Sequence, residues 1–489
     1  MTSNDSAPAP APAAAASGPD ARLPSPWPSP LRWDPLGSLV MRPWYDRLAV
    51  KLVPHWYFPL SRAWAAALES GEDTQAFAAA LGLERFPGGL CGWRLQRALA
   101  KTRELERVHA GADAHWRDLF FAAEAPPAAE LVAAERARRK AAHNLMAARR
   151  YFLCLRKQVP RVHWELPHPE EMPDVKALRG DGGTCIKHPS GPRSGPGGLP
   201  PVEQSHWVSG PFGRQCWIRF PSPGLPGDTA WAQVYEPEGV VNPPTLISLH
   251  GICMESEHWS ESMDSIDIVP TLALKGLRVI RPEGPWHGRR RRPGTFGGEP
   301  AMAQGPLGFL RLFAAWGAEV PVYVDWARRQ NGGQGSNHVA LGGVSLGALT
   351  SQLSAVAAKD WPQELRPDTL ILVACSESLH DVAFQGSLAA AIGLPQQLQD
   401  KGWSVADIDR YLPLMEPRGE PAMASERIVM ALGEADDLTP FAGGLALARR
   451  WGVPPANLFL RQQGHFTVAF DLGRRPQPLD RLIEILKAV

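Results

Sequence analysis

A serine between two glycines is the feature of this sequence with the clearest chemical meaning. Ser345 lies in the stretch Gly343-Val-Ser-Leu-Gly347, where an apolar strand pattern passes directly into a helical one. A sharp strand-to-helix turn needs glycine on both sides of its central residue, because a Cβ there would clash with the neighbouring strand and helix. A serine hydroxyl is essentially un-ionised at neutral pH and needs a base to attack a carbonyl carbon. The pattern therefore predicts Ser345 as a nucleophile with a partner base.

A histidine and several carboxylates follow Ser345 at the ends of later predicted strands. His465 comes after the last predicted strand and is preceded by Gly464, so it can reach back over the sheet edge as the general base. Asp436 follows the strand before that and precedes a Thr-Pro pair, and we predict that it orients the imidazole. Asp437 and Glu434 lie in the same loop and are alternatives for this role.

A fourth motif predicts the groups that would stabilise an oxyanion. The apolar strand Thr245–Leu249 ends in His250-Gly251. We expect one backbone N–H donor from Gly251 or Ile252, opposite the N–H of Leu346 at the start of the helix after Ser345. Removing one such donor typically costs about 3 kcal/mol of transition-state stabilisation.

With these motifs in the order serine, acid, histidine, residues 213–489 resemble the α/β-hydrolase superfamily. The resemblance implies an eight-stranded, mainly parallel sheet, with acyl transfer to Ser345 and then to water. This chemistry requires no metal and no organic cofactor. The stretch Arg281-Pro-Glu-Gly-Pro-Trp-His-Gly-Arg-Arg-Arg-Arg292, with Gly297-Gly-Glu-Pro300 after it, looks like the Pro-x-His-Gly-x-Arg loop of a poorly characterised esterase-like group in that superfamily. Candidate substrate-binding residues are His250, Trp286, His287 and Arg289.

The arginines at 289–292 permit two interpretations. Arginine pairs well with carboxylate and phosphate, so the run could bind an acidic substrate. A solvated charge run is the favoured interpretation.

Alternating strand and helix patterns predict the elements that must position these residues. An α/β fold with a mostly parallel sheet and helices on both faces is expected from about residue 213 onward. The predicted strands are Cys216–Phe220, Ala230–Tyr235, Thr245–Leu249, Arg278–Arg281, His338–Gly342, Thr369–Ala374, Arg427–Leu432 and Asn457–Leu460.

The chain before this domain divides by composition. Residues 1–34 are rich in Pro and Ala and are predicted to be a disordered tail. Residues 35–160 are predicted to be helical, and 161–212 to be a Pro/Gly-rich connector. Within the domain at 213–489, the segment 376–424 lies between two predicted strands, and its apolar residues favour a lid over the site rather than scaffold helices.

The helix predicted over 127–159 has an apolar stripe and a basic opposite face. Such a helix could make peripheral contact with an anionic membrane. Packing of the stripe on the neighbouring domain is the favoured interpretation, because isolated helices owe most of their stability to packing.

Overall composition argues against several classes of protein. The formal net charge is +1, so no bulk electrostatic field favours nucleic acid as a partner. The six cysteines show no paired or zinc-type spacing, which is typical of reduced thiols in the cytoplasm. The N-terminal stretch lacks the pattern of a signal peptide, which also favours a cytoplasmic location.

These features predict a cytoplasmic serine hydrolase that cleaves a carboxylic ester or a related acyl bond in a small-molecule substrate with an apolar part. Two alternatives remain. The same three residues could pass the acyl group to an acceptor other than water, or could otherwise be used without hydrolysis. The chain could also be a non-catalytic, hydrolase-like scaffold whose helical region binds a membrane or a protein.

Overall fold

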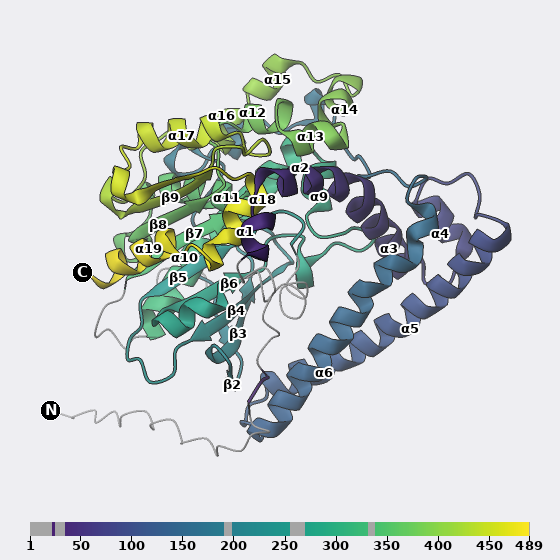
Figure 1. Ribbon diagram of the computed structural model, residues 1–489, viewed down its shortest axis with the longest axis horizontal. Coiled ribbons are helices and arrows are strands. Elements are labelled where there is room, and N and C mark those ends of the chain that lie inside the picture. The colour runs from purple at the N-terminus through teal and green to yellow at the C-terminus, as the bar shows by residue number, and fades with distance from the viewer. Residues whose placement is uncertain (1–21, 25–34, 190–197, 255–268, 331–337, 489) are drawn as a thin grey trace.

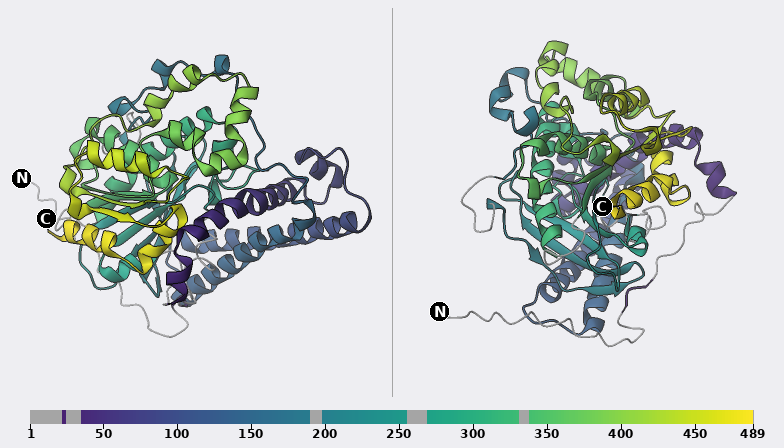
Figure 2. Two further views of the ribbon diagram at one scale, coloured as in Figure 1. Left: turned by 45° about the horizontal axis from the view of Figure 1, so that its top comes forward. Right: turned by 90° about the vertical axis from the view of Figure 1, so that its left-hand side faces the viewer.

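The computed structural model describes residues 22–24, 35–189, 198–254, 269–330 and 338–488 (Figure 1). A mostly parallel sheet lies at the centre with helices on both faces, and a helical region precedes it in the chain (Figures 1 and 2). The predicted α/β fold class is therefore confirmed.

The sheet has ten strands in the order β1-β3-β4-β6-β5-β7-β8-β9-β10, with β2 paired to β3. All eight predicted strands are present as β3 to β10, and β5 has the predicted bounds. The resemblance implied eight strands, and the two further ones are short segments that pair antiparallel with β3. The bounds are β1 Glu203–Gln204, β2 Val208–Gly210, β3 Gly213–Pro221, β4 Thr229–Glu236, β5 Thr245–Leu249, β6 Arg278–Pro282, β7 Val339–Val344, β8 Thr369–Val373, β9 Ile428–Gly433 and β10 Leu458–Arg461.

The strands from β6 to β10 run parallel, so the ends of β5, β7, β9 and β10 meet at one edge of the sheet. This edge receives all four motifs that the sequence singles out. The strands β7 and β8 are almost wholly buried, as expected for a parallel sheet covered on both faces.

Helices cover both faces of the sheet and enclose two apolar cores. The larger core lies between the sheet and α10 (Pro306–Gln330), α11 (Leu346–Ala357) and α17 (Phe441–Arg450). The smaller core lies under the 3₁₀ helix η8 (Pro270–Lys275), α18 (His465–Phe470) and α19 (Gln477–Lys487). Among the described residues only α10 is long and apolar enough to cross a membrane by length and composition, and 78% of its most apolar stretch is buried inside the protein.

The N-terminal region is a series of helices that ends in a long antiparallel hairpin. The pair α5–α6 projects from the side of the sheet (Figure 2). One end of this hairpin is fixed to the sheet by an aromatic cluster, in which Trp116 of α5 packs on Trp217 of β3 and Trp231 of β4. The helices are α1 Leu36–Val40, α2 Pro43–Leu52, the π-helical turn η3 Val53–Tyr57, α3 Phe58–Ser70, α4 Thr74–Ala80, α5 Gly89–Phe120, α6 Ala128–Ala147 and the 3₁₀ helix η4 Ala148–Leu155.

The apolar side chains of α6 face this cluster. Leu131, Val132 and Ala134 are buried with the tryptophans. On the same helix, Glu135 is buried between Arg138 and Arg139, at 2.9 and 2.7 Å. Part of the predicted basic face is therefore neutralised inside the protein.

The connector and the tail also contribute to the folded structure. The connector contains the short helix α7 (Val175–Leu178) as well as β1 and β2, and its residue Ile186 is fully buried in the larger core. In the segment predicted to be disordered, Arg22 bridges to Ser209 and Leu23 is buried beside Trp116. Residues 1–21 and 25–34 of that segment lie outside the described residues.

The arginine run at 289–292 joins the helical regions to the sheet domain. Arg289 pairs with Asp113 of α5 at 2.7 Å and lies over the Trp116 ring. Arg290 is fully buried and pairs with Glu319 of α10 and Asp228, each at 2.7 Å. The favoured interpretation of a solvated run is wrong for these two arginines, because both hold buried structural contacts.

A cap of five short helices follows β8 and stands over the edge where the motifs meet (Figure 1). These helices occupy the segment that was predicted as a lid. Their bounds are α12 Leu379–Phe384, α13 Ser387–Ile392, α14 Leu394–Asp400, α15 Val405–Asp409 and α16 Leu412–Met415.

The buried ion pairs of Arg290 predict a large loss of stability when this side chain is removed. We expect Arg290→Ala to lower the free energy of unfolding by about 3–5 kcal/mol, because Glu319 is left as an uncompensated buried charge. Arg292 pairs with Glu165 at 3.1 Å but is half exposed, so Arg292→Ala should change it by no more than about 1 kcal/mol. Chemical denaturation of both variants measures the difference, and equal effects would contradict the assignment.

Candidate active site

Ser345 occupies a strained bend between β7 and α11. Its backbone has φ 56° and ψ −120°, a conformation that is rare for a residue with a side chain. A Cβ at Gly343 would lie 2.5 Å from the backbone of Gly347, and one at Gly347 would lie 2.2 Å from the carbonyl oxygen of Leu249. Only glycine fits at these two positions, so the motif allows the turn that presents the Ser345 side chain.

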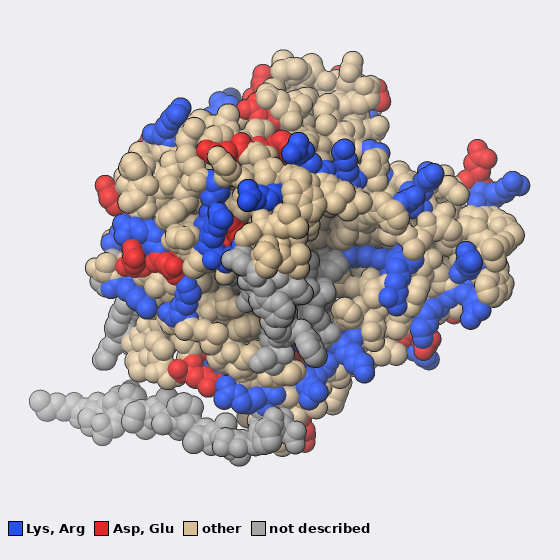
Figure 3. Space-filling model, in the orientation of Figure 1, with Lys and Arg blue, Asp and Glu red and all other residues tan. Residues whose placement is uncertain are grey.

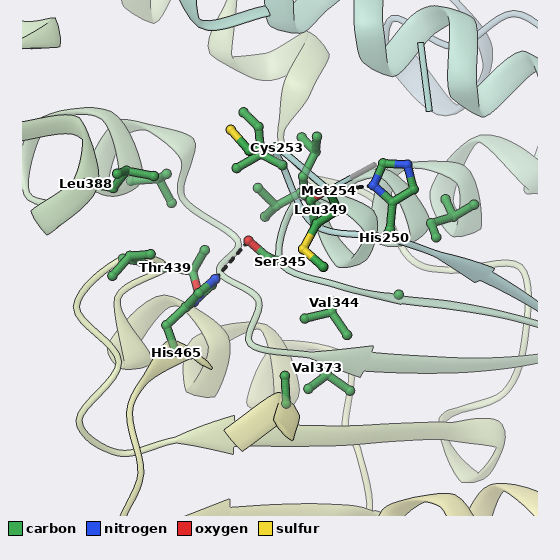
Figure 4. Close-up of a pocket in the computed structure, with 18 of the residues that line it drawn as sticks. His250, Cys253, Met254, Val344, Ser345, Leu349, Val373, Leu388, Thr439 and His465 are labelled. Carbon is green, nitrogen blue, oxygen red and sulfur yellow. Dashed lines mark hydrogen bonds between the residues drawn. The ribbon is translucent and has the colours of Figure 1, made fainter. Parts of the chain in front are cut away.

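The structure brings together the three side chains that the sequence analysis selects as catalytic. Ser345 Oγ lies 2.9 Å from His465 Nε2 (Figure 4). His465 Nδ1 lies 2.8 Å from Asp436 Oδ2. Because the carboxylate accepts the Nδ1 proton, Nε2 is left free to accept the proton of the serine hydroxyl.

The loop after β9 distinguishes Asp436 from the two alternative acids. Asp436 is buried, and its Oδ1 accepts the backbone N–H groups of Leu438 and Thr439, both at 3.0 Å. The Thr439 hydroxyl lies 2.9 Å from the other carboxylate oxygen, which receives His465. Asp437 is exposed and accepts the hydroxyl of Ser387, and Glu434 is exposed as well. Asp436 is therefore the carboxylate that the geometry favours.

The electrostatic surroundings make His465 a stronger base than an ordinary histidine. Burial opposes protonation of the ring, but the nearby carboxylates, Asp436 foremost, together outweigh it and raise the pKa of His465 above 6.5. Asp46 and Asp437 add smaller contributions in the same direction. An imidazolium at this position is thus stabilised by negative charge.

The predicted oxyanion donors border Ser345. A Cβ built on Gly251 would lie 3.6 Å from the Ser345 Cβ, so the loop after β5 passes directly beside the serine. Gly251, Ile252 and Leu346 all line the same cavity as Ser345. Leu346 is the first residue of α11, where backbone N–H groups have no acceptor within the helix.

Two histidines fix the path of this loop. His250 Nε2 accepts the Gly284 N–H at 2.9 Å, so its Nδ1 carries the proton and donates to the Gly251 carbonyl oxygen at 2.7 Å. Burial, and then the neighbouring His287, hold the pKa of His250 well below its usual value. His287 is fully buried, and its Nε2 accepts the Cys253 N–H at 3.2 Å.

These contacts change the interpretation of the four residues that were predicted to bind substrate. His250 lines the cavity, but its two ring nitrogens are engaged by backbone groups. Trp286, His287 and Arg289 lie outside the cavity lining, and Arg289 faces the helical hairpin instead. His250 and His287 hold the loop after β5 in place, and the resemblance to a loop motif could not distinguish this role from substrate binding.

The N-terminal region supplies two residues that the sequence analysis missed. Asp46 of α2 is buried, and its carboxylate accepts the backbone N–H groups of Gly464, Phe466 and Thr467 at 2.7–3.2 Å. It thereby caps the helix that begins with His465. Tyr57 donates its hydroxyl to the Cys253 carbonyl oxygen at 2.9 Å and so supports the loop after β5. One feature of the sequence could have drawn attention to Asp46: it is the only acidic residue in an otherwise apolar and basic segment, residues 36–57.

A largely apolar cavity of about 660 Å³ opens above Ser345. Its wall combines the N-terminal residues Tyr45 and Val53 with side chains of the cap, among them Leu388 (Figure 4). A cavity of this size is ordinary for a small organic ligand. Among the described residues no group of three or more His, Cys, Asp or Glu side chains is arranged to hold a metal ion.

The cap on the His465 helix makes a testable prediction for Asp46→Asn. Removing this negative charge lowers the pKa of His465, and the base must be neutral to act, so the acidic limb of the kcat/KM profile should move to lower pH. The exposed Glu434 makes no such contribution, so Glu434→Gln should leave the limb in place. Rate measurements across pH check both, and a profile that Asp46→Asn does not move would show that Asp46 acts only on stability.

Comparison with known proteins finds only distant similarity. No protein-family model and no curated protein sequence matches the chain. Among solved structures, an acetyl xylan esterase from Paenibacillus sp. R4 is 18% identical, covering 58% of this chain and 89% of that one, with a TM-score of 0.43. An S-formylglutathione hydrolase from Agrobacterium tumefaciens is 14% identical, covering 57% and 98%, with a TM-score of 0.36.

These similarities are too distant to carry an activity over to this chain. The fold follows from its own geometry. The mostly parallel sheet, the glycine-flanked bend at Ser345 after β7 and the order of serine, acid and histidine along the chain are together those of an α/β-hydrolase fold.

Proposed function

We propose that this protein is a serine hydrolase that cleaves a carboxylic ester or a related acyl bond through an acyl-serine intermediate. The observation that carries the proposal is the continuous chain of hydrogen bonds from Ser345 through His465 to Asp436 at the wall of an apolar cavity. A buried carboxylate, an oriented imidazole and an accessible hydroxyl are the parts that this chemistry requires.

The first half of the reaction acylates the serine. His465 takes the hydroxyl proton as Ser345 Oγ attacks the carbonyl carbon. The resulting imidazolium is stabilised by Asp436 and gives its proton to the departing alkoxide, so the alcohol leaves neutral. In the second half, His465 removes a proton from water, the hydroxide attacks the acyl carbon, and the proton returns to Ser345 Oγ as the acid is released.

Negative charge on the carbonyl oxygen requires donors that are already in place. The N–H of Leu346 and that of Gly251 or Ile252 are the proposed donors, because these residues border Ser345 on two sides of the cavity. The hydrogen bonds of His250, His287 and Tyr57 support the loop that carries the second donor.

The composition of the cavity wall supports an apolar acyl group as the part of the substrate that is bound. Cap residues from α12, α13 and α14 contribute mainly Leu, Ile, Val, Ala and Phe side chains. Burying such a chain is favourable by roughly 0.8 kcal/mol for each CH₂ group. The cap therefore acts as the lid-like wall that selects the acyl group.

Substitutions in the triad test the proposed reaction. Ser345→Ala should lower kcat for a p-nitrophenyl ester by roughly five to six orders of magnitude and abolish labelling by a fluorophosphonate. Asp436→Asn should lower kcat about 10⁴-fold, because it favours the wrong imidazole tautomer. Asp437→Asn is the matched control and should retain most activity, because Asp437 faces Ser387 rather than the imidazole. Folded wild-type protein that the probe fails to label would favour a non-catalytic scaffold.

Cap substitutions test the selection of the acyl group. Leu388 lines the same cavity as Ser345 and His465 (Figure 4). Leu388→Trp should fill part of the cavity and lower kcat/KM for long-chain p-nitrophenyl esters about tenfold or more relative to the acetate. Val405 lies in the same cap but is 57% exposed, so Val405→Trp should leave the preference unchanged. Equal losses on short and long esters would place the acyl group elsewhere.

A further inference from the structure

The segment 36–56 exposes an unusual number of large apolar side chains. Six of the fifteen large apolar residues that the described structure leaves exposed lie in α1, α2 and η3. They are Leu36 (44% exposed), Leu39 (64%), Trp44 (44%), Leu48 (45%), Leu52 (44%) and Trp56 (41%). Scattered single exposures are normal, whereas exposed apolar side chains that gather in one segment indicate an interaction surface.

The same segment also borders the active-site cavity. Trp44, Leu48 and Leu52 follow one another at four-residue steps and form an exposed stripe. The adjacent stripe consists of Tyr45, Ala49, Val53 and Tyr57, which line the cavity and are only partly buried. The rim of the cavity therefore lies beside the exposed apolar stripe.

The polar residues of this surface are basic. Its exposed polar side chains include Arg42, Arg47, Lys51 and His55, and the one acid of residues 36–57 is the buried Asp46. Arg156 of the neighbouring segment stacks on the Trp56 ring at 3.9 Å and adds to the positive charge. Figure 3 shows basic side chains separated by uncharged surface over the position of α2.

This composition matches one kind of partner better than the others. Leu and Trp side chains flanked by Lys and Arg are typical of helices that lie in the interface of an anionic bilayer. A second copy of the chain is disfavoured, because a two-fold interface would bring the basic residues of both copies together. Positive charge and indole rings both suit the headgroup region of a membrane.

We propose that the surface formed by residues 36–56 docks on an anionic lipid bilayer and places the cavity rim at the lipid interface. This inference rests on the proposed hydrolase function. The substrates would then be acyl esters of membrane lipids, which enter the cavity from the bilayer. The surface differs from the basic helix α6, whose apolar residues are buried against the sheet.

Vesicle binding tests the docking step without requiring activity. Full-length Ser345→Ala protein should co-sediment with vesicles of phosphatidylcholine containing phosphatidylglycerol, and more weakly with phosphatidylcholine alone. Binding to the anionic vesicles should weaken as salt concentration rises. Because this readout needs no catalysis, failure of the proposed hydrolase function would leave it unchanged, whereas absence of vesicle binding would overturn the docking proposal alone.

Two double variants identify the surface. In the same background, Leu48→Glu with Leu52→Glu should weaken partitioning into both kinds of vesicle by about tenfold or more. Arg47→Gln with Lys51→Gln should weaken binding to anionic vesicles by about thirtyfold and have little effect on neutral ones. Leu274→Glu changes a leucine that is 66% exposed outside this surface and should bind as the parent does.

Activity of otherwise wild-type protein links docking to substrate delivery. The variant with Leu48→Glu and Leu52→Glu should keep its rate on soluble p-nitrophenyl acetate and lose hydrolysis of esters presented in vesicles. Equal vesicle binding by this variant and the parent would overturn the proposal. A dimer that light scattering detects in the parent and not in the variant would assign the surface to a second copy and also overturn it.

Discussion

The hydrogen bond between Ser345 and His465 depends on nearly every layer of this structure. It joins residues that are 120 positions apart, and one of them sits on a backbone bend that is itself strained. The bend persists because two glycines allow the strand and helix to approach closely and because the Ser345 N–H is bonded to Val373 of β8 at 3.0 Å. The parallel sheet supplies the remaining constraint by bringing β7, β9 and β10 to a common edge.

A buried imidazole next to a buried carboxylate is costly unless each polar atom has a partner. Asp436 satisfies this condition through two backbone N–H groups, the Thr439 hydroxyl and His465. The loop that carries His465 has its own partner in Asp46, whose carboxylate accepts hydrogen bonds from the backbone N–H groups at the start of α18. The two carboxylates therefore hold the loops after β9 and β10, and both raise the basicity of the imidazole. This couples the stability of the site to its electrostatics.

The helical N-terminal region is part of the site and not an appendage to it. One short segment, α2 with η3, caps the helix that begins with His465, supports the loop after β5 through Tyr57 and forms part of the cavity wall. Arg289, after β6, ties the rest of this region to the sheet domain through its ion pair with Asp113 and its packing on the Trp116 ring. A segment that both completes the site and exposes apolar side chains can connect the cavity to a surface outside the protein.

The sequence by itself determined the strands, the main helices and the glycine-flanked serine, because each of these rests on patterns within about ten neighbouring residues. The order of the serine, the acid and the histidine could be read directly along the chain, because each follows a predicted strand. It left Asp436 among three acids, since only burial and backbone donors separate them. It misassigned Arg289 and missed Asp46, because their partners lie far away in the chain, 418 positions in the case of Asp46 and Gly464. Only the tertiary structure decided these roles, since the meaning of a charged side chain depends on which groups surround it once it is buried.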